Sequence, residues 1–516
     1  MSNPLHDALV RPAPACLRTA RALAAVAAIA TVSTLAGCGG GSDPDAGRTP
    51  AQAQIRARAQ SDLAPPLASP AFFVSTTGSD TGDGSSAHPW RTLNYAVSKL
   101  QAGNTLYAYG GTYAETVTVW HSGTASQPIT ITAYPGQKPV IDGATIAVPS
   151  WVGLLQVYGN DVTVSGFELR NINVDGHGGL GGTAVVQGGF GAVLYGTNDK
   201  IASMTIHDIW AQGVMVQGDA GTVADNVVHD VAMSNCRAAG HPNCSSTGPS
   251  SGWPSCVTIA SPYGHNQVIH GGTIERTTVY NCWGEGVSTW QSDGVTIQDN
   301  TIYDNWAENL YVNNATHALV QRNLVYNTPN NLVGKKAGFA LADEDTKNVT
   351  NLLSAHNVVI DNLVYNASFS AFGWTLVTGT GLVDDVIANN TIVDTDPTTT
   401  AFYTGGPSNN VVNTGSTIAD NIVIGPANVP TSTGLAFANN LWTAQPLNGA
   451  STGDVLAANA ALVIAGTGPI APGALTSAYF HLPPMSPAHV HGVPVPQVTT
   501  NYAGAPVQSP PDIGAF

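Results

Sequence analysis

A short repeat runs through the middle of this 516-residue chain and limits its fold more than any other feature. Segments that begin at Trp210, Trp283 and Trp306 share one pattern of apolar and polar residues. Residues 295–303 and 318–326 alternate apolar and polar side chains with period two, which is typical of short strands. Repeats of two or three strands without a helix stack as coils of a parallel β-helix, in which each rung buries its inward residues against its neighbours.

Asparagine recurs at the matching turn position of successive repeats. These residues are Asn226, Asn300, Asn323, Asn362, Asn390 and Asn421. Stacked rungs place such amides about 4.7 to 4.9 Å apart, so we expect them to hydrogen-bond as a ladder. Residues 90–100 have the apolar spacing of a short amphipathic helix that could close the open first rung. The sequence therefore predicts an all-β parallel β-helix solenoid with a short N-terminal capping helix.

A second matching position of successive repeats is occupied by side chains with rings, either histidine or tyrosine. His207-Asp208 and His229-Asp230 have the composition of proton-transfer pairs. The corresponding places in other repeats are filled by Tyr280, Tyr303, Tyr326 and Tyr365. A structural ladder explains both residue types, so we favour it over a catalytic role.

The N-terminal sequence indicates export. Arg18 and Arg21 precede an apolar run over residues 22–32, which is too short and too rich in alanine for a spanning helix. The run leads to Leu-Ala-Gly-Cys at residues 35–38, which resembles the bacterial lipobox. This resemblance implies cleavage before Cys38 and lipidation of its sulfur, which would anchor the protein stably to a bilayer. An ordinary signal peptide with an incidental cysteine is the alternative.

Composition divides the chain into five parts. These are a lipoprotein signal peptide at 1–37, a flexible tether at 38–70, an N-terminal cap at 71–115, the β-helix at 116–445 and an irregular C-terminal tail at 446–516. We expect an exported monomer, attached to the bacterial cell envelope at the outer membrane or cell surface only by its lipid.

Four cysteines lie beyond the lipobox, at Cys236, Cys244, Cys256 and Cys282. An even number in an exported chain favours disulfides, whose connectivity stays open. A zinc site is the alternative, although the spacings lack a Cys-x-x-Cys pair.

Several motifs resemble those of a known group. Residues 72–80, 88–90 and 103–113 resemble the N-terminal cap of bacterial right-handed parallel β-helix proteins of the pectate-lyase-like superfamily, and residues 512–516 resemble their common ending. The resemblance implies a right-handed β-helix over about residues 70 to 516. The group includes polysaccharide lyases, hydrolases, epimerases and non-catalytic surface proteins. No catalytic motif of one family matches residue by residue, so the function has to be argued from the site.

Two carboxylates occupy the same place in adjacent repeats, at Glu285 and Glu308. At one strand spacing they repel, which raises one pKa or recruits a cation, and calcium is the natural cation for an exported oxygen-rich site. A net charge of −16 weighs against nucleic acid as a partner and requires a bridging cation for a polyanionic substrate. A polar ladder at a strand entrance is the alternative.

A lysine pair follows one repeat later, at Lys335 and Lys336. The alignment places Lys336 within a residue of the Glu308 column, where a bound cation and partial burial would lower its pKa and free the amine as a base. Lys335 is expected to contact substrate. Asp343, Glu344 and Asp345 form a candidate second calcium loop. For the lysine pair and for this acidic triplet the alternative is a solvent-facing turn.

Trp290 and Tyr311 lie in opposite phase to the apolar core positions, so we expect them to stack on sugar rings. Together these residues predict a calcium-assisted polysaccharide lyase that cleaves a uronic-acid-containing polymer by β-elimination. In this hypothesis Arg322 or a lysine helps the cation held by Glu285 and Glu308 to neutralise the uronate, and Lys336 removes the proton. A glycoside hydrolase, a C5-epimerase and a non-catalytic glycan-binding lipoprotein stay open as alternatives.

Overall fold

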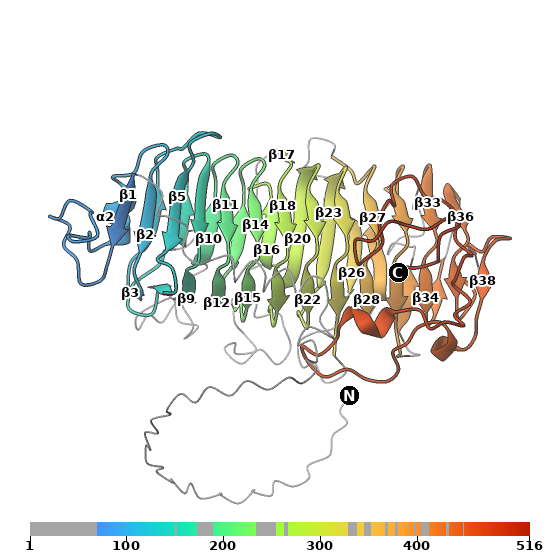
Figure 1. Ribbon diagram of the computed structural model, residues 1–516. Helices are drawn as coiled ribbons and strands as arrows, with labels where there is room; N and C mark the ends of the chain where they lie inside the picture. The colour runs from blue at the N-terminus through green and yellow to red at the C-terminus, as the bar shows by residue number, and fades with distance from the viewer. Residues whose placement is uncertain are drawn as a thin grey trace, which may run out of the picture. The chain divides into compact units, whose positions relative to one another are not determined.

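The computed structural model describes residues 70–149, 152–172, 189–233, 254–262, 267–328, 338–344, 352–366, 370–376, 380–396, 399–403, 412–429, 433–446 and 448–516. Over these residues the chain winds through three parallel sheets, and successive coils add one strand to each sheet (Figure 1). We call them sheets A, B and C, in the order in which the chain first enters them. The expected all-β parallel β-helix is confirmed.

Sheets A and B each contain 13 strands. Sheet A consists of β1 (Ala71–Val74), β2 (Thr105–Ala108), β5 (Ile129–Ala133), β8 (Val162–Ser165), β11 (Lys200–Ala202), β14 (Thr222–Ala224), β18 (Thr273–Glu275), β21 (Thr296–Gln298), β24 (Leu319–Gln321), β27 (Val358–Ile360), β30 (Val386–Ala388), β33 (Ser416–Ala419) and β36 (Leu435–Ala438). Sheet B consists of β3 (Gly111–Tyr113), β6 (Pro139–Asp142), β9 (Glu168–Ile172), β12 (Thr205–Ile209), β15 (Val227–His229), β19 (Thr278–Tyr280), β22 (Thr301–Tyr303), β25 (Leu324–Tyr326), β28 (Leu363–Tyr365), β31 (Thr391–Val393), β34 (Ile422–Ile424), β37 (Leu441–Trp442) and β38 (Val455–Leu456).

Sheet C contains 12 strands and carries the candidate site. Its strands are β4 (Val117–Val119), β7 (Gly153–Val157), β10 (Phe190–Leu194), β13 (Val214–Val216), β16 (Ser255–Ala260), β20 (Glu285–Asp293), β23 (Leu310–Thr316), β26 (Phe339–Asp343), β29 (Ser370–Leu376), β32 (Thr400–Tyr403) and β35 (Ala427–Asn428), with β17 (Ile269–His270) paired to the end of β20.

Inward side chains of sheet C form continuous apolar rows. In one row Val257 pairs with Val287, Val287 with Leu310, and Leu310 with Phe339, and all four are fully buried. Burial of each such side chain stabilises the fold by about 1.5 to 3 kcal/mol. Within each strand, the residues that alternate with these core residues point outward. Every second residue of a sheet C strand is therefore available for a site.

The turn between sheets A and B contains the asparagine ladder. The Nδ2 of Asn300 donates to the Oδ1 of Asn323 at 2.9 Å, and Asn323 donates in the same way to Asn362 at 2.9 Å. The predicted ladder is confirmed from Asn300 to Asn421 and extends to Asn440. A residue with positive φ, such as Arg322 (φ 52), precedes each of these amides and makes the tight corner.

The second column of the repeat is also a ladder. The rings of His207 and His229 stack with centroids 5.0 Å apart, and the stack continues through Tyr280, Tyr303 and Tyr326 at 4.8 to 5.0 Å. Each histidine Nδ1 lies 2.6 Å from the neighbouring aspartate. The favoured interpretation as a structural ladder agrees with this geometry.

The ends of the β-helix carry the few helical turns of the described residues. Helix α2 (Leu93–Val97) lies within the segment expected to be helical and buries Leu93, Ala96 and Val97. At the other end, η1 (Ala460–Leu462) and η2 (Ser477–Phe480) belong to a C-terminal segment that lies back over the later rungs (Figure 1). Phe480 and Ile513 from this segment join Tyr326, Tyr365 and Ile422 in a second apolar cluster.

Cys256 and Cys282 form a disulfide that links β16 to the turn before β20, as an exported chain with paired cysteines predicted. Cys236 and Cys244 lie outside the described residues. Within the part of the chain that the structure describes, the helices are all too short or too polar to cross a membrane.

Candidate functional site

Glu285 is the first residue of β20, where the chain enters sheet C, and its Cα partner is Ser255 of β16. The Ser255 hydroxyl donates to Glu285 Oε2 at 2.7 Å and lies 2.7 Å from the hydroxyl of Ser288. Ser288 in turn donates to Thr258 Oγ1 at 2.9 Å. The glutamate is therefore fixed at one end of a chain of hydroxyl groups on the outer face of sheet C.

The environment keeps Glu285 protonated near neutral pH. Burial, then the negative charge of Glu308 on the next rung, raises the pKa of Glu285 to about 8, against the opposing hydrogen bonds from Ser255 and Ser288. A carboxyl group in this state is neutral at pH 7 and can donate a hydrogen bond. The expectation that the two stacked glutamates interact and that one pKa rises agrees with the structure.

Tyr311 lies at the centre of this face. It pairs with Ser288 on one side and with Ala340 on the other, in opposite phase to the core residue Leu310. The pKa of Tyr311 is raised well above its usual value, first by burial and then by the negative charges of Glu344, Glu285 and Glu308. The phenol therefore stays protonated.

The expected stacking role of Tyr311 is wrong as stated. Its outward phase is correct, but the residue is only 6% exposed and packs against Ala340 and Ala342. Because its ring is covered, it does not present an open face to a sugar. Trp290 also points outward, between Ala260 and Asn313, and is half-buried, so its contact with substrate stays a prediction.

Glu344, which the sequence places in a candidate calcium loop, contributes to this face through Asn313 and Tyr311. It follows β26, its backbone N–H donates to Asn313 Oδ1 at 3.2 Å, and its side chain hydrogen-bonds Tyr311. Strand alternation was the available signal, because Phe339 and Leu341 face the core and Glu344 has the opposite phase. The cross-strand register from Glu285 would have found Ser255. Strict alternation would not have found Ser288, because it is three residues from Glu285 along the strand.

Asp343 does not belong to this face, so its predicted role as a calcium ligand is wrong. It shares the inward phase of Phe339 and Leu341 and is fully buried. Its Oδ1 accepts the backbone N–H of Ser354 at 2.7 Å, and burial raises the pKa of Asp343 to about 6. A buried acid of this kind caps the strand end and has no access to a cation from solvent.

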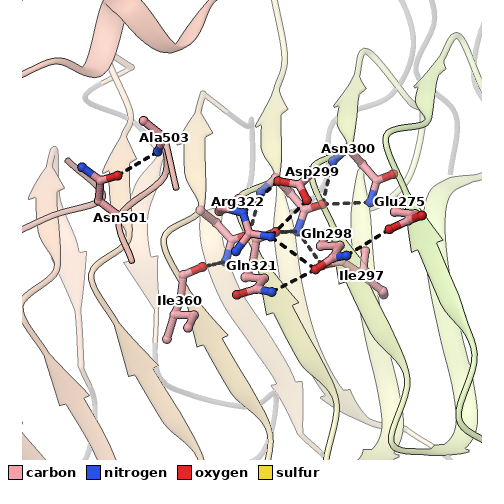
Figure 2. Close-up of polar contacts among 12 residues, drawn as sticks. Glu275, Ile297, Gln298, Asp299, Asn300, Gln321, Arg322, Ile360, Asn501 and Ala503 are labelled. Carbon is pink, nitrogen blue, oxygen red and sulfur yellow. Dashed lines mark hydrogen bonds and ion pairs between the residues drawn. The ribbon is translucent and has the colours of Figure 1, made fainter. Parts of the chain in front are cut away.

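Arg322 is also misplaced by the sequence hypothesis. It lies in the turn after β24, between sheets A and B, whereas Glu285 opens a strand of sheet C. Its guanidinium forms a two-pronged ion pair with Asp299, at 2.8 and 3.0 Å, and also contacts Gln298 (Figure 2). The predicted role of Arg322 beside the two glutamates is therefore wrong, because its charge stabilises a corner of the coil.

Four other predicted residues lie outside the described residues: Cys38, Lys335, Lys336 and Asp345. Among the residues that are described, no three or more histidine, cysteine, aspartate or glutamate side chains converge closely enough to hold a metal ion. Calcium prefers six to eight oxygen ligands. The described part of the face does not supply such a set.

Residues 72–307 match the family model described as "Pel9A-like, right handed beta helix region". Over these residues the chain is similar to the Pel9A-like right-handed β-helix region. The matched region contains β1 to β22 and includes Glu285 together with its two serine partners.

Two curated proteins are similar to parts of this chain. YwoF, an uncharacterized protein of Bacillus subtilis, is 32% identical over 152 residues, which is 29% of this chain and 30% of YwoF. Pectate lyase PEL9 of Emericella nidulans is 39% identical over 83 residues, which is 16% of this chain and 20% of PEL9. The matches thus span under a third of either relative. The solved structure of pectate lyase Pel9A superposes with a TM-score of 0.48 at 14% identity, over 86% of this chain and 96% of Pel9A.

Proposed function

We propose that this Pel9A-like protein is a polysaccharide lyase that cleaves a uronic-acid-containing polymer by β-elimination on the outer face of sheet C. The observation that carries the proposal is the pair of protonated acids, Glu285 and Tyr311, on a face that also carries Glu308 and Glu344. The match to the Pel9A-like region supports it.

The chemistry of β-elimination explains why such a pair is useful. The enzyme has to stabilise the uronate carboxylate while the adjacent proton leaves, and it has to protonate the departing glycosidic oxygen. A neutral Glu285 donates a hydrogen bond to a substrate carboxylate without adding repulsion. A protonated Tyr311 supplies the proton to the leaving oxygen, and Lys336 is proposed as the base.

Calcium is part of this proposal only as a prediction. Glu308 and Glu344 make the face acidic, so an anionic substrate approaches it more readily with a cation present. Because the described carboxylates do not form a coordination set, no step of the mechanism is assigned to the ion.

A second candidate is supported by one specific observation. A protonated Glu285 beside the charged Glu308 also has the form of an acid and nucleophile pair, which is the arrangement of a retaining glycoside hydrolase. The two candidates require different things of Glu285: a lyase needs a hydrogen-bond donor, whereas a hydrolase needs a proton that is transferred.

A panel of acidic and neutral polysaccharides tests the proposal. Release of unsaturated ends that absorb in the ultraviolet, together with reducing ends, supports a lyase, and reducing ends alone identify a hydrolase. Binding without either product would refute both enzymes in favour of a glycan-binding protein.

Substitution of Glu285 separates the two reactions further. Glu285→Gln keeps a neutral donor, so a lyase retains much of its activity, whereas a hydrolase loses roughly 10²-fold or more. Tyr311→Phe should abolish lyase turnover, and Tyr303→Phe, in the sheet B ring ladder, is the matched control that leaves it unchanged.

A further inference from the structure

Three aromatic rings stack on sheet C near its N-terminal end, several rungs from Glu285. Trp120, Tyr158 and Tyr195 each follow directly on a strand, β4, β7 and β10 respectively. The ring centroids of Trp120 and Tyr158 are 4.2 Å apart and those of Tyr158 and Tyr195 are 4.4 Å apart, with interplanar angles of 9° in both pairs. The stack thus repeats the strand spacing of the coil.

Trp120 is the terminal ring of this stack. Strand β4 is the edge of sheet C, and no described strand pairs with its other side. Both faces of Tyr158 are covered by its neighbours, whereas Trp120 is 67% exposed. One indole face is therefore held in a fixed orientation with its outer side toward solvent.

The surroundings of Trp120 indicate what this face can bind. The neighbouring residues His121, Ser122 and Asn160 are exposed and polar. A protein partner or a lipid surface generally needs a contiguous apolar patch of several hundred Å². A single flat ring with a polar rim instead matches a sugar, which has an apolar C–H face and hydroxyl groups around its edge.

The strand register connects this ring to the candidate site. Backbone hydrogen bonds from Tyr195 to Val157 and from Gln217 to Leu194, at 2.8 Å each, carry the outward row of Trp120 from rung to rung. The row then passes through Ala260 to Trp290. Five rung spacings separate Trp120 from Trp290, which is about 24 Å along the sheet.

We propose that the outer face of Trp120 binds one sugar residue of the polysaccharide whose cleavage is proposed above. The inference rests on that proposed function and deepens it, because a separation of about 24 Å can be bridged only by a polymer. The enzyme should therefore bind long chains more tightly than short oligosaccharides, through a contact remote from the reacting sugar.

Affinity electrophoresis of the full chain in gels that contain acidic polysaccharides tests the contact without any need for turnover. Trp120→Ala should weaken binding of long chains about threefold to tenfold, the loss expected for one stacked ring. Trp120→Leu keeps apolar area but removes the flat face, so it should lose as much. Leu462→Ala, which removes a large exposed side chain elsewhere, should bind like the wild type.

Unchanged affinity in Trp120→Ala overturns the inference. Full affinity in Trp120→Leu also overturns it, because it would indicate apolar docking and not stacking on a flat ring.

Kinetic measurements separate failure of the Trp120 site from failure of the proposed function. Trp120→Ala should raise KM for polymer with kcat unchanged, and leave trisaccharide cleavage unaffected. Turnover that is independent of Trp120 at every chain length refutes the Trp120 site alone, whereas a wild type that neither binds nor cleaves any polysaccharide refutes both proposals.

Discussion

Substituting Asp361 by asparagine should stabilise this protein, and increasingly so as the pH rises. Asp361 occupies the corner between β27 and β28 with φ 55, is 1% exposed, and has no hydrogen-bond partner for either carboxylate oxygen among the described residues. On the neighbouring rung Arg322 is already paired with Asp299. The equivalent corner position on the next rung is Asn389, whose side-chain amide donates to the carbonyl oxygen of Gly514 at 3.2 Å.

The magnitude follows from the pKa of Asp361, which burial raises from 3.8 to about 8 even though the charge of Arg322 opposes the shift. The folded state therefore binds a proton that the unfolded state releases between about pH 4 and pH 8. Stability from this group is present at acidic pH and is lost as the pH rises through that window. At 1.36 kcal/mol for each pKa unit, the loss between pH 5 and pH 8 is about 4 kcal/mol.

Thermal unfolding followed by circular dichroism at pH 5 and at pH 8 measures the effect. Asp361→Asn should exceed the wild type in Tm at pH 8 by several degrees more than at pH 5. Asp384→Asn is the matched control, because Asp384 also has a positive φ of 52 but its side chain is 51% exposed. The prediction would be refuted if Asp361→Asn and the wild type differed in Tm by the same amount at both pH values, or if the variant were less stable at pH 8. Either result would show that burial does not raise the pKa of this carboxyl group.

Three further predictions concern other residues. Lys336→Arg should abolish turnover and largely preserve substrate binding, because a guanidinium stays charged and cannot act as a base. Lys335→Arg, the control, should stay active. The reverse result would shift the assignment of the base by one residue. Cys38→Ser should move the protein from the membrane fraction to a soluble one, and identical fractionation would contradict lipidation. Replacing Cys256 and Cys282 by serine should lower the free energy of unfolding by about 3 kcal/mol in a denaturant titration, because their disulfide closes a 26-residue loop. An unchanged free energy of unfolding would mean that the disulfide does not restrain the unfolded chain.

The repeating parts of this fold could be predicted because equivalent residues of successive repeats lie in the same environment. The asparagine ladder, the ring ladder and the inward rows follow from period-two alternation and from the alignment of turns. Arg322 directly precedes Asn323 of the ladder, so the same alignment places it at the corner between sheets A and B and not beside Glu308.

The exposure of side chains on the outer face is harder to predict from the sequence. Phase alone places Tyr311 outward, and only the packed neighbours Ala340 and Ala342 show that it is covered. The run of charged residues at 343–345 predicts a loop, although strand alternation places Asp343 with the core residue Leu341. Sequence therefore predicts the direction of a side chain in this fold better than its exposure.

The ladder between sheets A and B also determines where this protein can change length. Consecutive amides of the ladder are separated by 23 residues from Asn300 to Asn323 but by 39 from Asn323 to Asn362, and the two hydrogen bonds are equally short. The additional residues lie at the ends of the sheet C strands: β25 ends at Tyr326 and β26 begins at Phe339, and β26 ends at Asp343 while β27 begins at Val358. Differences in coil length are thus accommodated around sheet C, while the ladder from Asn300 to Asn440 holds these coils in register. The length of the chain beside the candidate site can therefore vary while the ladder is preserved.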